Sequence, residues 1–493
     1  QIENNTIGND NFIYMYGGKM NRCKINGNTT TSTSSYRLIY LSSSTISNTE
    51  ICGNNSTYST EPLCLYNNSE ALNCTFVNNV MKSTSCALLQ NSSKLTNSIV
   101  VGNQYATGYN NHLTFGGSEN VVSHSMIEGG ADGVGNINGS MEFAAFANAD
   151  SGDYSLTEKS LCIDAGTEVA DTLDLLGNVR KQREAVDMGA IESSLEAQTL
   201  TELDEIVYVK AGSDGDGTSW NTAFGDVHQA IVAASLDGKK HQIWVAAGTY
   251  YGDTTLTSVL HLEKGISLYG GFAGTETSLS ARDTAQNPTI LDGKKARRVI
   301  SQNYAFPDSM SVVVDGFTVQ NGTAVNGGGV NIRKNAIVNN CIIKNNTATS
   351  YGTAIYAVDS SVIKNSLICD NTYLSSGSRT VYLNNAMMDS CVLSNNRAYY
   401  NSVIYAENNS KVSNCTFEKN VNGYIYSSRG SYLNNSQFVN CEFKNTSSYA
   451  ASTELSNGSK MNGCSIRNNT NVNYNLLYVN GNSLAEDCQI ENN

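Results

Sequence analysis

The chain has 493 residues, of which 15% are charged and only 3 are proline. Its formal net charge is −13, and it has no Lys/Arg-rich run or aromatic-basic patch, so nucleic acid is excluded as an expected partner. The apolar runs are too short to cross a bilayer, so we expect no transmembrane segment within this chain. No Cys/His spacing indicates zinc, and no motif indicates a cofactor.

A short motif recurs roughly every 24 to 25 residues, as in CIIKNN at 341–346. Each copy begins with an anchor, usually a small residue, followed two positions later by an apolar residue and, in most copies, five positions later by asparagine. This alternation is typical of a half-buried strand, and the period indicates stacked repeats. The anchors are Cys23, Thr49, Cys74, Ser98, Ser125, Phe317, Cys341, Ser366, Cys391, Cys415, Cys441, Cys464 and Cys488.

Two further short strands accompany many anchors. One has the form AIYA (354–357), TVYL (380–383), VIYA (403–406) or LLYV (476–479), and the other resembles SVIKNS (361–366). Two or three short strands per period describe one coil of a β-helix, and each coil adds about 4.8 Å of length. We therefore predict an all-β fold, a right-handed parallel β-helix in two segments with a short capping helix, in which stacked asparagine amides join one turn to the next.

Residues 1–195 are predicted to be the carboxy-terminal part of a β-helix. Its coils run to about residue 130, and 131–195 form a closing segment that contains DLLGNVR (174–180) and VDMGAIE (186–192). Its charged residues could form an active site. We favour turns and a buried salt bridge that finish the edge of the solenoid. These residues are Asp164, Asp174, Arg180, Asp187 and Glu192.

Residues 196–205 read as a linker, and residues 206–493 as the amino-terminal cap and coils of a second β-helix. Phe224, Val227, Ile231 and Ala234 have helical spacing, which predicts an amphipathic helix that plugs the first coil. The closing end of one β-helix therefore precedes the amino-terminal cap of another in the sequence. The motif QIENN occurs at both 1–5 and 489–493. We expect the chain to be one period of a longer chain of tandem β-helix domains, with identical units end to end as possible partners.

The 13 cysteines fall mostly at the anchor position, where serine or threonine replaces them in other coils. This interchange favours small buried thiols over disulfides or metal ligands. Cys52 and Cys369 each follow an inward apolar position by one residue, so we expect both to point outward.

Several stretches resemble known families. IVYVKAGSDGDGTSW (206–220) and IWVAAGTY (243–250), supported by ISLYGGFAGTETSLSARD (266–283) and DGFTVQNG (315–322), resemble the amino-terminal cap of pectate-lyase-like β-helix proteins. GGGV (327–330) and the Phe-x-x-Asn pairs are similar to repeats of polymorphic outer membrane proteins and adhesin-like proteins. The closing segment resembles that of secreted β-helix proteins of Bacteroidetes-type bacteria. The resemblance implies a secreted protein that is extracellular or lies on the outer cell surface.

A stripe of tyrosines is the candidate contact site for a glycan or protein surface. The inward positions of the second strand leave its tyrosines outward, about one coil apart. The alternative is that tyrosine simply favours strands. The predicted site residues are Tyr356, Tyr382, Tyr405, Tyr426 and Tyr478.

Catalysis on acidic glycans by a polysaccharide lyase or glycoside hydrolase is the alternative function, because those enzymes use the same fold. Such enzymes need clustered carboxylates or a basic residue beside the sugar. The nearest approach to a cluster is Asp370, Asp389 and Lys364. We therefore predict a non-enzymatic protein that acts in adhesion or as a structural unit of a surface fibre.

Overall fold

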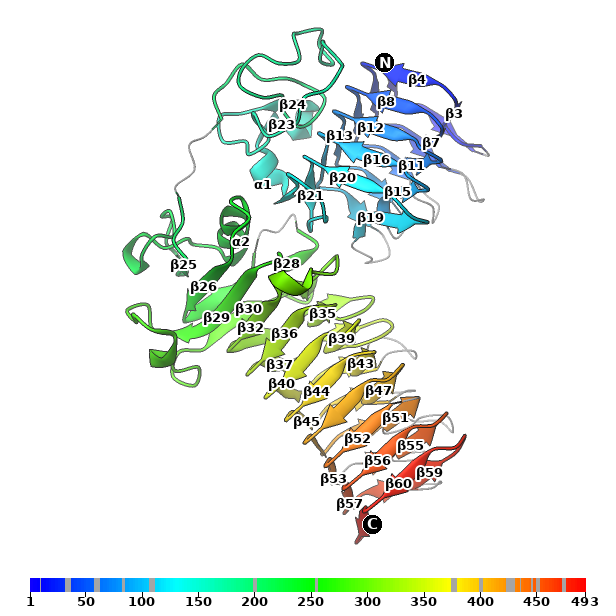
Figure 1. Ribbon diagram of the computed structural model, residues 1–493, viewed down its shortest axis with the longest axis vertical. Coiled ribbons are helices and arrows are strands. Elements are labelled where there is room, and N and C mark those ends of the chain that lie inside the picture. The colour runs from blue at the N-terminus through cyan, green and yellow to red at the C-terminus, as the bar shows by residue number, and fades with distance from the viewer. Residues whose placement is uncertain are drawn as a thin grey trace. The chain divides into compact units, whose positions relative to one another are not determined.

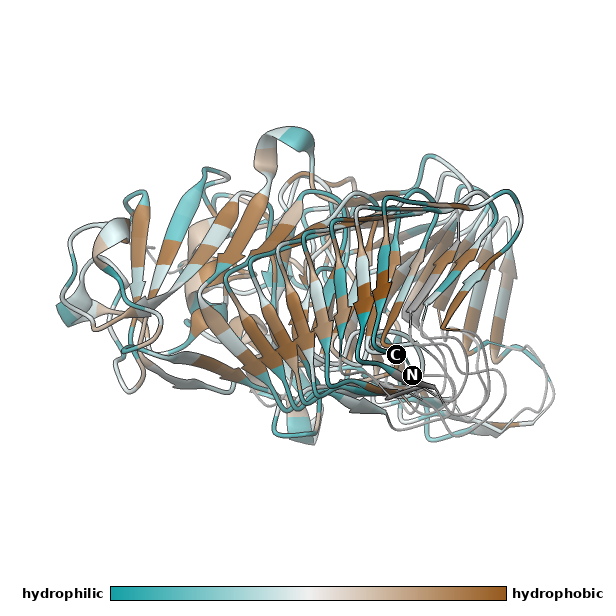
Figure 2. Ribbon diagram, turned by 90° about the horizontal axis from the view of Figure 1, so that it is seen from below, coloured by the Kyte–Doolittle hydropathy of each residue, from teal (hydrophilic) through white to brown (hydrophobic). Residues whose placement is uncertain are grey.

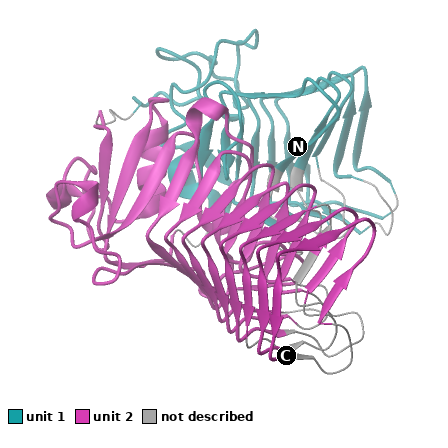
Figure 3. Cartoon of the chain, turned by 60° about the horizontal axis from the view of Figure 1, so that its bottom comes forward, with its two compact units in different colours: residues 1–201 teal, residues 202–493 magenta. Residues whose placement is uncertain are grey.

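The computed structural model is a parallel β-solenoid of about 17 turns with very little helix (Figure 1). This confirms the predicted parallel β-helix. The chain divides into two compact units, residues 1–201 (unit 1) and 202–493 (unit 2) (Figure 3). The structure describes residues 1–8, 10–31, 37–56, 63–81, 85–105, 111–197, 202–252, 256–373, 379–398, 402–422, 431–434, 436–444, 447–448, 453–471 and 476–493.

Unit 1 has four parallel sheets, so its coils contain four short strands, one more than the two or three expected. The strands that follow the anchors form the anchor sheet of unit 1: β1 (Ile2–Glu3), β5 (Lys24–Asn26), β9 (Glu50–Cys52), β13 (Thr75–Val77), β17 (Ile99–Val101), β21 (Met126–Glu128) and β22 (Ile137–Gly139). The other sheets consist of β2 (Thr6–Ile7), β6 (Thr29–Thr30), β10 (Asn55–Ser56), β14 (Val80–Met81) and β18 (Gln104–Tyr105); β3 (Ile13–Tyr16), β7 (Ile39–Ser42), β11 (Leu63–Tyr66), β15 (Ser85–Gln90) and β19 (Asn111–Gly116); and β4 (Lys19–Asn21), β8 (Thr45–Ser47), β12 (Glu70–Leu72), β16 (Lys94–Thr96) and β20 (Val121–Ser123).

Unit 2 continues the same plan in longer sheets. Its anchor sheet consists of β27 (Gly248–Tyr250), β30 (Thr289–Asp292), β33 (Phe317–Gln320), β37 (Ile342–Lys344), β41 (Leu367–Cys369), β45 (Val392–Ser394), β49 (Thr416–Glu418), β53 (Glu442–Lys444), β57 (Ser465–Arg467) and β61 (Gln489–Glu491). The tyrosine sheet consists of β28 (Ser258–His261), β31 (Arg298–Ser301), β35 (Val330–Ile332), β39 (Ile355–Val358), β43 (Val381–Asn384), β47 (Ile404–Glu407), β51 (Ser431–Asn434), β55 (Thr453–Ser456) and β59 (Leu477–Val479).

The third long sheet of unit 2 lies directly before the anchors in sequence. It consists of β25 (Ile206–Val209), β26 (His241–Ala246), β29 (Ile266–Phe272), β32 (Val312–Asp315), β36 (Ala336–Asn339), β40 (Val362–Lys364), β44 (Met387–Asp389), β48 (Lys411–Ser413), β52 (Gln437–Val439), β56 (Lys460–Asn462) and β60 (Leu484–Glu486). Two small sheets complete the coils: β34 (Thr323–Ala324), β38 (Thr347–Ala348) and β42 (Thr372–Tyr373), then β46 (Arg397–Ala398), β50 (Val421–Asn422), β54 (Ser447–Ser448) and β58 (Thr470–Asn471).

The core is a set of columns in which equivalent side chains stack from coil to coil. Ile343 pairs in register with Ile368, and Ile368 with Leu393, so an inward position in one coil lies over the same position in the next. Figure 2 shows the brown apolar residues recurring at equivalent places along the strands. The predicted inward residues are buried in all but the last coil: Ile25, Ile51, Phe76, Val100, Ile127, Val319, Ile343, Ile368, Leu393, Phe417, Phe443 and Ile466.

Asparagines join the coils through their side chains, as predicted. In unit 2, Asn346 Nδ2 donates to Asn371 Oδ1 over 3.1 Å, and Asn371 Nδ2 donates to Asn396 Oδ1 over 3.0 Å. The backbone before this ladder, at Asn345, has a φ of 55°, a left-handed conformation that asparagine tolerates. The ladder and the sharp turn are therefore made by adjacent asparagines and not by the same residue.

The anchor cysteines other than Cys23 and Cys488, which are partly exposed, are buried, as predicted for thiols that pack as small apolar groups. Cys391, Cys415, Cys441 and Cys464 occupy consecutive coils as free cysteines, and the Cys391 amide donates to Cys415 Sγ over 3.4 Å. Burial raises the pKa of the Cys341 thiol to about 12, so this thiol is unreactive at neutral pH.

The cap of unit 2 contains the predicted helix, α2 (Val227–Ser235). Asp226 caps its N-terminus by accepting hydrogen bonds from the amides of His228 and Gln229 over 2.8 and 3.2 Å. Val227, Ile231 and Ala234 are buried in the core against β25, β26, β28 and β29, whereas Phe224 lies before the helix. None of the helices formed by the described residues has the length and apolar character that a bilayer crossing requires.

The closing segment does more than finish the end of unit 1. After β22 it forms α1 (Met141–Ala144) and an antiparallel pair, β23 (Phe146–Asn148) and β24 (Asp153–Leu156), joined by a 3-10 turn at Ala149–Ser151. The remainder lies along the outer face of the anchor sheet, where Asp171 binds Asn48, Ala190 binds Thr75 and Gly189 binds Asn97. Three consecutive coils are thus covered from the side. Other 3-10 turns are Trp220–Thr222, Leu279–Ala281 and Asp308–Met310.

Candidate functional site

The predicted tyrosine stripe is formed by consecutive strands of the tyrosine sheet. Tyr356 of β39 pairs in register with Tyr382 of β43, and Tyr382 with Tyr405 of β47. The residue before each tyrosine is fully buried in the core: Ile355, Val381 and Ile404. Because side chains alternate along a strand, the three tyrosines lie on the outer face, as predicted.

The three rings form a continuous stack, which we call the tyrosine ladder. The centroids of Tyr356 and Tyr382 are 4.9 Å apart with an interplanar angle of 12°, and those of Tyr382 and Tyr405 are 5.8 Å apart at 14°. Tyr382 therefore has neighbours on both ring faces and is only 7% exposed. A partner cannot stack on this central ring and would meet ring edges and hydroxyl groups instead.

A tyrosine and an arginine outside the strands complete the cluster. Tyr351 stacks on Tyr382 with centroids 5.0 Å apart and is 37% exposed. The guanidinium carbon of Arg379 lies 4.4 Å from the ring centroid of Tyr351 and 4.1 Å from that of Tyr405. These distances are those of cation–π contacts. Arg379 itself is half-buried.

The hydroxyl group of the central tyrosine is directed to an acidic residue. Tyr382 donates to Glu407, which belongs to the next coil, and Asn384 Nδ2 donates to the Tyr382 hydroxyl over 3.3 Å. Burial and the contact with Glu407 both raise the pKa of Tyr382. The cluster therefore combines neutral phenols, one arginine and one glutamate, a set suited to polar recognition.

The other two predicted site residues do not join the ladder. Tyr426 lies outside the described residues, and the register partner of Tyr405 is Tyr432 in β51. Tyr478 of β59 is 42% exposed, and Glu454 of β55 lies between it and Tyr432 in register. The predicted stripe is therefore interrupted before the last coil.

Unit 1 has a shorter version of the stack. Tyr14 and Tyr40 are register neighbours whose centroids are 5.3 Å apart at 2°. The next residue in the column is Cys64, which ends the stack of register neighbours. Stacked tyrosines thus occur in both units. Among the described residues, an arginine between two tyrosine rings occurs in unit 2 alone.

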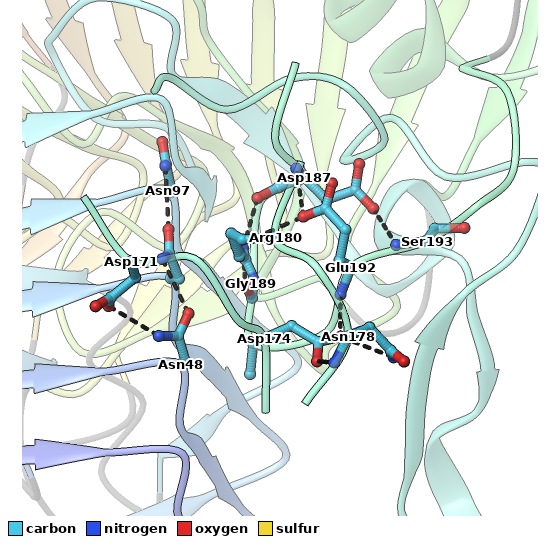
Figure 4. A network of polar contacts seen from close by, with 12 residues as sticks. Asn48, Asn97, Asp171, Asp174, Asn178, Arg180, Asp187, Gly189, Glu192 and Ser193 are labelled. Carbon is cyan, nitrogen blue, oxygen red and sulfur yellow. Dashed lines mark hydrogen bonds and ion pairs between the residues drawn. The ribbon is translucent and has the colours of Figure 1, made fainter. Parts of the chain in front are cut away.

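The charged residues of the closing segment form a buried network, as the favoured interpretation predicts (Figure 4). Arg180 Nη2 donates to the carbonyl groups of Asp187 and Gly189 over 2.9 and 2.5 Å, and Arg180 Nε lies 3.5 Å from Glu192 Oε2. Asp174 accepts from the amides of Asn178 and Glu192. Burial raises the pKa of Glu192 to about 8 and that of Asp187 to about 6. Because the groups are buried, this network holds the segment together and offers no open site.

The weak acidic cluster considered for catalysis is not assembled as one group. Lys364 and Asp389 are register neighbours on β40 and β44, but Asp370 lies at the turn after β41 in a different sheet. Asp389 accepts from Ser413 Oγ and Asn414 Nδ2 over 2.6 and 2.8 Å, and these bonds lower its pKa. Across the described ranges, no group of three or more His, Cys, Asp or Glu side chains is placed to hold a metal ion.

Comparison with known proteins identifies the family. Residues 210–486 match the family model described as "Protein of unknown function (DUF1565)", which is more than half of the chain. The chain belongs to the DUF1565 family. A comparison of the DUF1565 chain with curated proteins found no match. The predicted likeness to polymorphic outer membrane and adhesin-like proteins stays a prediction.

Solved structures similar to the DUF1565 chain share little sequence with it. The pectate lyase Pel9A is 13% identical, with a TM-score of 0.33, over 59% of this chain and 78% of that chain. ORF18 of Geobacillus virus E2 is 12% identical, with a TM-score of 0.27, over 58% and 62%. A pectin methylesterase from Aspergillus niger is 13% identical, with a TM-score of 0.27, over 60% and 87%. These likenesses transfer no activity or residue role to the DUF1565 chain.

Proposed function

We propose that this DUF1565 protein is a secreted, non-enzymatic β-helix protein that acts in adhesion or as a structural unit of a surface fibre. The observation that carries the proposal is the tyrosine ladder with Arg379 placed between Tyr351 and Tyr405. The rigid sheet fixes these groups at a regular spacing, so a partner would meet several weak contacts at once. The predicted partners are a glycan or protein surface, or identical units.

The chemistry of the ladder favours a polar partner. Its ring faces are largely used by neighbouring rings, which leaves hydroxyl groups, ring edges and the N–H groups of Arg379 for contact. An arginine held between two aromatic rings has lost much of its side-chain freedom before binding. Such a surface suits hydroxyl- and carboxylate-bearing groups of glycans or proteins more than lipid.

The test is binding of the full chain to a glycan array and to immobilised extracellular proteins. We expect Tyr351→Ala and Arg379→Ala each to weaken binding by about tenfold, which corresponds to about 1.4 kcal/mol. Tyr16→Ala is the matched control, because Tyr16 is a 78% exposed tyrosine in unit 1 outside the cluster. Unchanged binding by both the Tyr351→Ala and Arg379→Ala variants would refute the assignment of the contact surface.

Two further experiments address the rest of the proposal. Electron microscopy of the native protein should show long rods with a regular repeat if the protein is a fibre unit, and isolated particles otherwise. Incubation with acidic polysaccharides tests the alternative of a lyase or hydrolase. Release of oligosaccharides would overturn the non-enzymatic assignment.

A further inference from the structure

The outer face of the anchor sheet is covered in unit 1 and exposed in unit 2. In unit 1 the first residues of three consecutive anchor strands, Thr75, Ile99 and Met126, are buried beneath the closing segment. The equivalent residues of unit 2 are Ile342, Leu367 and Val392, which are aligned in register. Ile342 is 41% exposed, and the other two are half-buried.

The closing segment of unit 1 packs closely against the outward side chains Thr75, Ile99 and Met126 of the anchor sheet. Gly189 has a φ of 97°, and a Cβ atom there would lie 2.8 Å from Ile99 Cδ1 and 2.9 Å from Thr75 Oγ1. The neighbouring amide, that of Ala190, donates to Thr75 Oγ1 over 2.9 Å. A glycine-alanine step is therefore what allows the segment to approach the sheet.

The turn before each anchor supplies the polar part of the contact. Asn97 donates to the carbonyl of Thr167 and accepts from its amide, both over 2.8 Å, and Asn48 donates to Asp171 over 2.8 Å. Asn48 and Asn97 have left-handed backbones, with φ of 47° and 49°. Each places its side-chain amide beside the outer column of the anchor sheet.

Unit 2 has the same arrangement without the cover. Asn340 and Asn365 occupy the equivalent turn, with φ of 49° and 51°, directly before Cys341 and Ser366. The second outward position is buried in both units, at Val77 and Val101 in unit 1 and at the smaller Cys369 and Ser394 in unit 2. We define the open anchor face as Asn340, Ile342, Asn365, Leu367 and Val392. Lys344 and Glu418 bound it on either side along the stack.

We propose that the open anchor face of unit 2 binds a polypeptide segment with the chemistry of residues 160–195. A glycine-alanine step of that segment would pack on Ile342 and Leu367, the equivalents of Thr75 and Ile99. Its main-chain amide and carbonyl groups would pair with Asn365, the equivalent of Asn97. The covered face of unit 1 shows that this sheet accepts such a segment. The face spans three coils, about 14 Å at about 4.8 Å per coil, which matches the three coils that the closing segment contacts.

Titration of the full chain with a fluorescently labelled synthetic peptide of residues 160–195, followed by anisotropy, tests the proposal. We expect saturable binding, and we expect Leu367→Glu to weaken it by tenfold or more, since burial of one large aliphatic side chain is worth roughly that factor. Thr416→Glu is the matched control: Thr416 pairs in register with Val392 but lies outside the face. Leu367 faces outward, so both variants leave the core columns intact.

A second variant tests the role of the close approach. The peptide carrying Gly189→Val should lose binding, since its added side chain cannot fit against the aliphatic column. Absence of saturable binding, or equal binding by the wild-type and Leu367→Glu chains, would overturn the proposal. Self-association in sedimentation velocity that Leu367→Glu abolishes would assign the face to a second copy of the chain and would equally overturn it.

Discussion

Replacement of Asn371 by alanine tests whether the asparagine ladder stabilises the solenoid. The Asn371 side chain accepts from Asn346 N and Asn346 Nδ2 over 3.0 and 3.1 Å. It donates to the carbonyl groups of Ile343 and Cys369, both over 2.9 Å, and to Asn396 Oδ1 over 3.0 Å. Asn371→Ala removes all five bonds and leaves the buried Asn346 amide without this acceptor. A buried group left unsatisfied costs about 1–3 kcal/mol, and the vacated volume about 1 more, so we expect a loss of about 2–4 kcal/mol.

Urea unfolding followed by tryptophan fluorescence measures this loss. Both tryptophans of the chain, Trp220 and Trp244, belong to unit 2, so their emission reports on that unit. With a slope of roughly 3 kcal/mol per molar urea, the midpoint should fall by about 1 M. Asn462→Ala, at an exposed strand position, is the control and should change the stability by less than about 0.5 kcal/mol. Equal midpoints for the two variants would refute a stabilising role of the ladder.

Three other expectations follow from buried polar groups. Burial raises the pKa of Glu192 from 4.5 to about 8. The contribution of protonated Glu192 to the stability of the closing segment is therefore complete below about pH 4.5 and is lost as the pH rises towards 8. Hydrogen exchange in residues 174–192 should accelerate over that range, and should accelerate less in Glu192→Gln. Tyr382→Phe removes the hydroxyl bonds to Glu407 and Asn384 and should lower the stability of unit 2 by about 1 kcal/mol. Tyr382→Ala also removes the stack and should cost about 3–5 kcal/mol, and equal losses in urea unfolding would contradict this division. Alkylation mapped by mass spectrometry should modify the partly exposed Cys23 and Cys488 before Cys74, whose thiol pKa burial raises to about 12; early labelling of Cys74 would contradict its burial.

The fold was predictable because its core repeats. Each inward residue contacts the equivalent residue of the next coil, so apolar residues recur at a regular interval in the sequence, as Ile343, Ile368 and Leu393 do. The position of the closing segment had no such signal. Its contacts join Asp171 to Asn48 and Ala190 to Thr75, pairs separated by 123 and 115 residues that occur once each. For the same reason Cys52, expected to point outward, is buried beneath the segment, in contact with Tyr154.

The candidate site was predictable only where it lies in strands. Tyr356, Tyr382 and Tyr405 share a repeated position, whereas Tyr351 and Arg379 lie in the connections between strands, which vary in length and sequence. The prediction of Tyr426 rested on an Ile-Tyr pair, but 27 residues separate Tyr405 from its register partner Tyr432, compared with 23 between Tyr382 and Tyr405. Because this interval is longer, the tyrosine in register with Tyr405 is Tyr432 and not Tyr426.

The uniform joining of one coil to the next also determines how the solenoid would respond to mechanical load. Neighbouring coils in unit 2 are connected by the backbone pairs of several sheets and by one asparagine bridge, and each such layer resembles the one before it. Under tension, coils should peel away one at a time at similar forces. A coil such as that from Ile343 to Ile368 contains 25 residues. Each rupture would therefore lengthen the chain by about 80 Å at roughly 3.3–3.6 Å per residue, so the solenoid would extend many times over before the last coil opened.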